Sequence, residues 1–232
     1  MSRKILNVPA LTAIAVLCLS VAAGSPAAAQ SAKDVDYTEM SPQELAEYLI
    51  YEADGFRTGT KTQEGTTVGA RLRQDELQKT CSTLKGGQID SDTAQKVTEL
   101  ARDSMKHPDG AIELGDWKRG QKLAENAFGF RVGHKVDDHS AKETGGLCIN
   151  CHTLEEKKAI RSGTLGPSLV GYGKAHGTGE QTRKHTYEML YNPHAFFPCT
   201  KMPRFGVNGV LTQEKISHIM AYLLDPDSPV NK

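Results

Sequence analysis

The chain has no net charge. Its 28 lysine and arginine residues are balanced by 28 aspartate and glutamate residues. Proteins that bind nucleic acid or an anionic membrane surface usually carry a basic excess or a basic stripe. The balance of charge therefore argues against both nucleic acid and a membrane surface as partners.

Long hydrophobic runs are also absent, apart from one near the start. Residues 11–23 are apolar, but the run is too short and too rich in small side chains to make a bilayer span. Arg3 and Lys4 precede it, and residues 27–29 are three alanines that suit a cleavage site. We therefore predict a secretory signal peptide over residues 1–29, a periplasmic location and no membrane insertion after cleavage.

Two other interpretations of this leader are less favoured. An uncleaved anchor fits poorly with the alanine cleavage site. Lipid attachment would use Cys18, but the preceding Val16 and Leu17 do not resemble a lipid-attachment box. We expect neither.

Strand-like alternation of apolar and polar residues is missing from the chain. Apolar residues recur instead at helical spacing. The predicted fold class is therefore all-α.

Cysteine is scarce, and its placement is informative. Only four cysteines follow the leader, and two of them lie in the run Cys-Ile-Asn-Cys-His at residues 148–152. This C-x-x-C-H spacing is typical of covalent c-type haem attachment, which takes place outside the cytoplasm. Cys148 and Cys151 would form thioethers to one haem c, and His152 would be the proximal iron ligand.

The remaining pair, Cys81 and Cys199, lies in a chain predicted to reach an oxidising compartment. That location favours a disulfide between them. The alternative is a reactive or metal-binding thiol, and the sequence cannot give the distance between the two residues.

The length indicates more than a minimal electron carrier. About 200 residues follow the leader, whereas about 80 to 120 suffice when a haem supplies much of the core. We expect an N-terminal helical extension over residues 30–112 and a cytochrome c domain over residues 113–232, with a turn at residues 108–110 between them.

Three helices are expected in the extension. Residues 41–44 combine an N-cap, a proline at the first helical position and a capping-box glutamate. Residues 54–69 are expected to form a loop, and further helices are expected over residues 71–82 and 92–106. The extension shows no chemistry of its own, so we expect a helical covering of the haem domain that also contributes to a partner interface.

The haem domain is expected to open with a helix over residues 116–128 and to end with one capped by Thr212 and stopped at Asp225. Gly120 inside the first helix is unfavourable by roughly 1 kcal/mol relative to alanine. A close approach of the two helices, with Tyr222 near Gly120, would explain it. The mixed-charge run at residues 155–158 is expected to be a solvated face.

The sixth iron ligand is expected to be Met202. This methionine is followed by a proline, lies in a loop 50 residues after His152, and precedes the last helix. A thioether ligand favours Fe(II) and raises the potential. Met189 and Met220 lie in helical patterns and are expected in the core. Rival ligands are Cys199 as a thiolate and the histidines, with His194 the strongest among them; the others are His107, His134, His139, His176, His185 and His218.

Four segments together resemble the SoxX family, the monohaem c-type cytochrome subunits of the SoxAX complex of sulfur-oxidising bacteria. They are the haem motif, residues 166–169 (Gly-Pro-Ser-Leu), residues 202–206 (Met-Pro-Arg-Phe-Gly) and residues 221–226 (Ala-Tyr-Leu-Leu-Asp-Pro). The similarity covers about residues 113–232 and implies a class I cytochrome c-like domain. It also implies that the carbonyl of Pro167 accepts a hydrogen bond from His152.

The resemblance implies a role in thiosulfate oxidation. SoxAX, an L-cysteine S-thiosulfotransferase, couples thiosulfate to a cysteine of the SoxYZ carrier and releases two electrons. The catalytic haem belongs to the SoxA partner of the heterodimer. This chain would accept the electrons at a His152/Met202 iron and pass them to a small cytochrome c, so it would carry electrons and hold no catalytic residue itself.

Three hypotheses follow. The first is the electron-transfer subunit of SoxAX, and the second is a free-standing class I cytochrome c without a catalytic partner. The third is an enzyme in its own right that uses Cys199 or an open iron site.

Overall fold

The computed structural model describes residues 36–53, 55–62, 64–84, 88–129 and 143–232. The predicted signal peptide, Cys18, His134 and His139 lie outside these residues. Residues 41–232 form one compact unit, and residues 36–40 belong to a separate one. The expected boundary between residues 112 and 113 stays a prediction.

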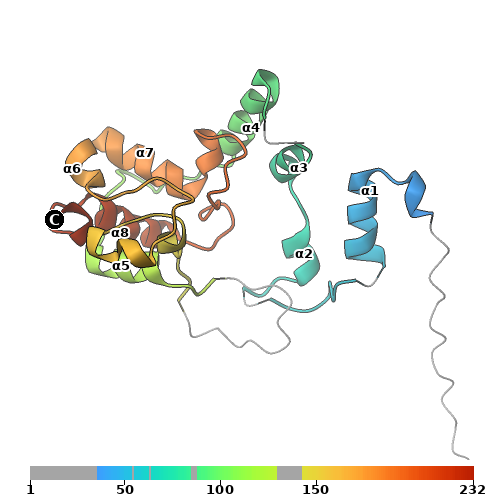
Figure 1. Cartoon of the computed structure of the whole chain (residues 1–232), viewed down its shortest axis with the longest axis horizontal. Helices are drawn as coiled ribbons and strands as arrows, with labels where there is room; N and C mark the ends of the chain where they lie inside the picture. Colours follow the sequence, from blue (N-terminus) through green and yellow to red (C-terminus); the bar gives the residue numbers. More distant parts are fainter. Residues whose placement is uncertain (1–35, 54, 63, 85–87, 130–142) are drawn as a thin grey trace, which may run out of the picture. The chain divides into compact units, whose positions relative to one another are not determined.

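The described residues are helical, and they contain no β-strand beyond an isolated bridge between Lys61 and Thr67. The all-α prediction is therefore confirmed at this level. None of the described helices is long and apolar enough to cross a membrane. The α-helices, drawn in Figure 1, are α1 (Pro42–Glu47), α2 (Val68–Leu72), α3 (Glu76–Ser82), α4 (Ser91–Asp103), α5 (Trp117–Glu125), α6 (Tyr172–His176), α7 (Glu180–Tyr191) and α8 (Gln213–Leu224). Short 3₁₀ or π turns occupy Tyr37–Glu39, Tyr48–Glu52, Cys148–Asn150, Glu156–Arg161, Pro193–Ala195 and Pro229–Asn231.

The start of α1 follows from its sequence. The Ser41 hydroxyl accepts a hydrogen bond from the Glu44 backbone N–H at 3.3 Å, and the Glu44 carboxylate accepts one from the Ser41 N–H at 2.8 Å. This reciprocal pair is the predicted capping box. The helix buries no residue, however, so it does not form part of the core.

The single helix expected over residues 71–82 is wrong, because α2 and α3 are separate helices. Arg73 has an extended backbone, and Asp75 is the N-cap of α3. Asp75 and Gln78 form a second capping box, with hydrogen bonds of 2.8 and 3.1 Å. This cap starts a new helix at Glu76 and overrides the apolar spacing on which the longer helix was predicted.

Helix α4 differs from the expected range, because it begins one residue earlier, after the N-cap Asp90, and ends three residues earlier, at Asp103. Two apolar residues of this helix are buried. Val97 and Ala101 pack in a cluster with Leu77 of α3 and Ala195. This small core joins the N-terminal helices to the segment that follows α7.

Helices α5 and α8 make the most extensive contact between any two described helices, and Figure 1 shows them side by side. Gly120 of α5 allows this approach, because a Cβ at that position would overlap the carbonyl of His218 and lie 2.9 Å from the Cβ of Tyr222. The predicted helix crossing is confirmed. Helices α6 and α7 also pack on α8; α7 contains Met189, whereas α6 was not predicted.

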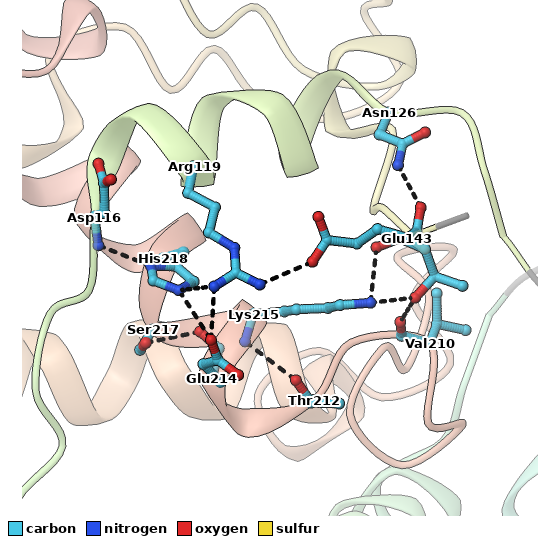
Figure 2. Close-up of polar contacts among 11 residues, drawn as sticks. Asp116, Arg119, Asn126, Glu143, Val210, Thr212, Glu214, Lys215, Ser217 and His218 are labelled. Atoms are coloured by element: carbon cyan, nitrogen blue, oxygen red, sulfur yellow. Dashed lines mark hydrogen bonds and ion pairs between the residues drawn. The ribbon is translucent and has the colours of Figure 1, made fainter. Parts of the chain in front are cut away.

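Polar contacts surround the α5–α8 crossing (Figure 2). The guanidinium of Arg119 in α5 donates to Glu214 of α8 at 2.7 Å and to Glu143 at 3.1 Å. The ammonium of Lys215 in α8 donates to the hydroxyl of Thr144 at 2.8 Å. These bonds attach the segment that leads into the haem motif to both helices.

A buried carboxylate reinforces the same crossing, and it corrects an expectation. Residues 155–158 were expected to face solvent, yet Glu155 is only 2% exposed. Its Oε1 accepts hydrogen bonds from Tyr222 at 2.7 Å, from Gln121 at 2.8 Å and from Lys158 at 2.8 Å. A run of charged letters does not reveal that Tyr222 and Gln121, both remote in sequence, supply donors for a buried charge.

Burial raises the pKa of Glu155, but hydrogen bonds from Lys158 and Tyr222 outweigh this effect and hold the pKa below that of an ordinary glutamate. Burial lowers the pKa of Lys158, but its bonds to Glu125 and Glu155 prevail and raise it. The carboxylate therefore stabilises the fold above pH 4.5 and loses this contribution as the pH falls through its lowered value. The ammonium contributes below pH 10.5 and loses its contribution as the pH rises through its raised value.

We predict that Gly120→Ala destabilises the protein. Alanine gains up to about 1 kcal/mol in helix propensity, but the new Cβ meets backbone that cannot move aside, so the net loss should be about 1–3 kcal/mol. Urea unfolding measures it. The matched control is Gly59→Ala, because no atom lies within 4 Å of a Cβ there; similar losses for both variants would refute the close-approach explanation.

We also predict that Tyr222→Phe lowers the free energy of unfolding by about 1–3 kcal/mol, because it removes one donor from a buried carboxylate. The loss should be largest near neutral pH. It should shrink in acid as Glu155 becomes protonated. Urea titrations at a series of pH values from 7 down through the titration of Glu155 test this, and a loss that stays constant across that series would contradict it.

Candidate haem site

The imidazole of His152 is held by a main-chain contact. Its Nδ1 lies 2.8 Å from the carbonyl oxygen of Pro167, which is the hydrogen bond that the family resemblance implied. A carbonyl can only accept, so Nδ1 carries the proton. In the neutral ring, Nε2 then keeps its lone pair for a metal.

The segment that supplies this carbonyl runs along the haem motif. The Gly166 N–H donates to the Cys151 carbonyl at 2.7 Å, and the Leu169 N–H donates to the Thr153 carbonyl at 2.8 Å. A Cβ on Gly166 would lie 2.6 Å from Nδ1 and 2.8 Å from Nε2 of His152. Only glycine permits such a close approach to the ring, so Gly166 and Pro167 together set the orientation of His152.

Cys148 and Cys151 stand at the ends of one short turn. The carbonyl of Cys148 accepts hydrogen bonds from the N–H groups of Cys151 at 3.0 Å and His152 at 2.9 Å. Leu147, just before the turn, has a left-handed backbone with φ 45°. Neither cysteine is in a disulfide, and burial raises the pKa of the Cys148 thiol to about 12.

Met202 lies in an irregular segment between α7 and α8. It is half-buried and packs against the main apolar cluster, which includes Phe205 and Leu211. Cys148 packs against the same cluster, and a Cβ on Gly146 would lie 3.1 Å from its sulfur and 3.7 Å from both Phe205 and Leu211. The cluster thus connects the attachment cysteine with the segment of the expected distal ligand.

Cys81 and Cys199 form a disulfide, with Cα atoms 5.3 Å apart. The favoured pairing is confirmed. Because Cys199 has no free thiol, it is neither a thiolate ligand to iron nor the reactive thiol of the third hypothesis. The other sulfur ligand considered for this region, Met202, remains available.

Most of the rival histidines in the described residues have other contacts. His107 pairs with Glu188 at 2.8 Å, and His218 accepts the Asp116 N–H at 2.8 Å. His176 and His185 lie against the rings of Tyr172 and Phe196. His194 is different, since it is buried and its Nδ1 has no hydrogen-bond partner among the described residues. Burial, together with nearby Arg204, lowers its pKa and favours the neutral ring.

The donor set fits a covalently attached haem. Two unpaired cysteines, an imidazole with Nε2 left free and a half-buried thioether are the groups that a His/Met c-type site requires. The residues that would hold the group are Cys148, Cys151, His152, Pro167 and Met202.

Two features of the site region were not found from the sequence. Arg204, directly after Met202-Pro203, is buried and donates to Asp75 at 2.8 Å. Asp75 is also the N-cap of α3, so an unremarkable helix of the extension is bonded to the Met202 segment. The only signal in the sequence was the Asp75/Gln78 capping pattern, and it does not reveal the long-range partner.

The chain is 37% identical over 179 residues to a protein of Aquifex aeolicus (strain VF5) named an uncharacterized lipoprotein. The match covers 75% of this chain and 82% of that protein. No family model matches the chain. At this identity and coverage, the chain belongs to the same family as the Aquifex aeolicus lipoprotein.

Proposed function

We propose that this protein is a periplasmic c-type cytochrome with a class I cytochrome c-like domain, and that it is the electron-transfer subunit of a SoxAX-type complex. It would pair with a SoxA subunit as a heterodimer. It would accept electrons released when thiosulfate is coupled to a SoxYZ carrier cysteine, and pass them to a small cytochrome c. The enzyme is the complex, and this chain is its electron carrier.

One observation carries the proposal. The Cys-Ile-Asn-Cys-His run ends in a histidine whose Nδ1 donates to the Pro167 carbonyl at 2.8 Å. A histidine that only fills space gains little from this arrangement, whereas a proximal ligand needs a fixed tautomer and a fixed ring orientation. Gly166 lies close enough to the ring to exclude other orientations.

A haem bound here supplies one-electron transfer between Fe(II) and Fe(III). The chain's own residues determine how well this occurs. Pro167 fixes His152, the apolar cluster around Phe205 and Leu211 keeps water from the Cys148 side, and Met202 offers a ligand that suits both oxidation states. Two electrons from one coupling event require two successive transfers through a single haem.

The location is proposed on three grounds. The leader has the pattern of a secretory signal peptide, and the Aquifex aeolicus relative is named a lipoprotein, which favours a place in the cell envelope. A disulfide between Cys81 and Cys199 suits an oxidising compartment. The mass of the native protein separates cleavage after residue 29 from lipid attachment at Cys18.

We predict that Met202→Ala abolishes the methionine–iron charge-transfer band of the ferric holoprotein and lowers its reduction potential, because loss of the thioether destabilises Fe(II). Absorption spectroscopy and potentiometric titration measure both effects. Met189→Ala is the matched control, since Met189 lies within α7. An unchanged band in Met202→Ala would refute the assignment, because another methionine would then be the ligand, whereas a wild-type holoprotein without the band would favour His194 as the rival ligand.

The functional proposal is tested on the native periplasmic protein. Acid–acetone extraction should leave the pigment on the polypeptide, because thioethers do not dissociate. An affinity pull-down should recover a second haem subunit, and the recovered complex should reduce the haem of this chain when thiosulfate and the carrier are added. Recovery of the chain alone, with a normal methionine band, would favour the free-standing carrier; extraction of the pigment would refute both.

A further inference from the structure

We infer that helix α3 positions the Met202 segment through two bonds, the Cys81–Cys199 disulfide and the Asp75–Arg204 ion pair, and so keeps the Met202 thioether in place as the distal ligand. This inference rests on the proposed function. It assigns a role to part of the N-terminal extension for which the sequence offered no chemistry.

The two bonds lie on either side of Met202. Cys199 precedes it by three residues and is joined to Cys81 of α3. Arg204 follows it by two residues and is bonded to Asp75, the N-cap of the same helix, at 2.8 Å. A six-residue segment is thus held near both ends by one seven-residue helix.

The disulfide also holds Cys199 in an unfavourable backbone conformation. Cys199 has φ 58°, a left-handed conformation that glycine adopts readily and a residue with a Cβ does not. Without the cross-link, the chain at this position has reason to relax to negative φ and to carry Met202 with it. The bond between Cys81 and Cys199 opposes that relaxation.

The ion pair between Arg204 and Asp75 makes release of this second attachment unfavourable. The Arg204 side chain is 7% exposed, and Asp75 is its partner. Separating them would leave a buried guanidinium without its counter-charge, which is strongly unfavourable. Leu77 of α3 packs in a cluster with Ala195 and Cys199, so apolar contact adds to the two polar attachments.

The expected consequence is slow release of the thioether. An external ligand can bind iron at the Met202 position only when the segment opens, so its binding rate reports the open population. Removing the disulfide should raise that population. We expect cyanide to bind the ferric holoprotein about tenfold faster, which corresponds to about 1.4 kcal/mol of lost segment stability.

The experiment compares ferric wild-type holoprotein with the Cys81→Ser/Cys199→Ser variant by stopped-flow mixing with cyanide. A second preparation keeps the wild-type sequence. The Cys81–Cys199 disulfide of the folded holoprotein is reduced with a dithiol, and the two freed thiols are alkylated. Ferricyanide then returns the haem iron to the ferric state. Reduction adds two electrons and two protons to the disulfide and yields two thiols. This preparation keeps the test valid if the double variant fails to fold.

Two further variants separate positioning from general loosening. Asp75→Asn keeps an N-cap oxygen but removes the charge opposite Arg204, so it should also accelerate cyanide binding. Asp116→Ala removes the N-cap of α5, because the Oδ1 of Asp116 accepts a hydrogen bond from the Lys118 N–H at 2.7 Å. Asp116 takes no part in the two bonds between α3 and the Met202 segment. Asp116→Ala should lower stability without changing the cyanide rate.

Hydrogen exchange supplies a readout that does not depend on iron. The Met202 N–H donates to the Thr200 hydroxyl at 3.3 Å, and its exchange should accelerate when the disulfide is removed. Faster cyanide binding and faster exchange relative to Asp116→Ala support the inference. If the disulfide-free protein binds cyanide and exchanges the Met202 amide no faster than Asp116→Ala, the inference is overturned while the proposed function stands. A wild-type holoprotein that lacks the methionine band overturns the proposed ligation itself.

Discussion

The close contact between α5 and α8 at Gly120 is the constraint on which the rest of the region around Cys148–His152 depends. Because no side chain separates the helices there, Tyr222 of α8 comes within hydrogen-bond distance of Glu155, three residues after His152. Arg119 and Lys215 attach the segment before the haem motif to the same pair of helices. The motif is therefore fixed on both sides to one helix crossing.

From that base, the site is built by main-chain groups more than by side chains. The Pro167 carbonyl sets the tautomer of His152, and Gly166 sets the position of the ring. The Cys148 carbonyl closes the turn between the two cysteines. Such groups cannot rotate away, which is what a ligand with constant geometry in two oxidation states requires.

The opposite side of the proposed site is organised differently. The Met202 segment has no regular structure, and its attachments to α3 are a covalent bond and an ion pair in which the arginine is buried and the aspartate is half-exposed. Helices α3 and α4 also bury apolar surface against Ala195, so part of the extension shares a small core with the segment that follows α7. If Met202 binds iron as proposed, such reinforcement matters, because a loosened ligand would change both the potential and the access of small molecules to the iron.

Local chemistry explains what was predictable from the amino-acid sequence alone. The caps at Ser41 and Thr212 and the glycine at position 120 are short-range patterns, and the structure confirms each of them. The Cys148–His152 run is also a short-range pattern, and the haem that it predicts stays a proposal. Only the tertiary structure showed that Glu155 is buried and that Asp75 pairs with Arg204. The separation of α2 from α3 has a local signal, the Asp75/Gln78 capping pattern, which the apolar spacing concealed. A buried charge is tolerated only where other polar groups pair with it. Tyr222, which bonds to Glu155, is 67 residues away from it in the chain, and Asp75, which bonds to Arg204, is 129 residues away, so no local pattern reveals these partners.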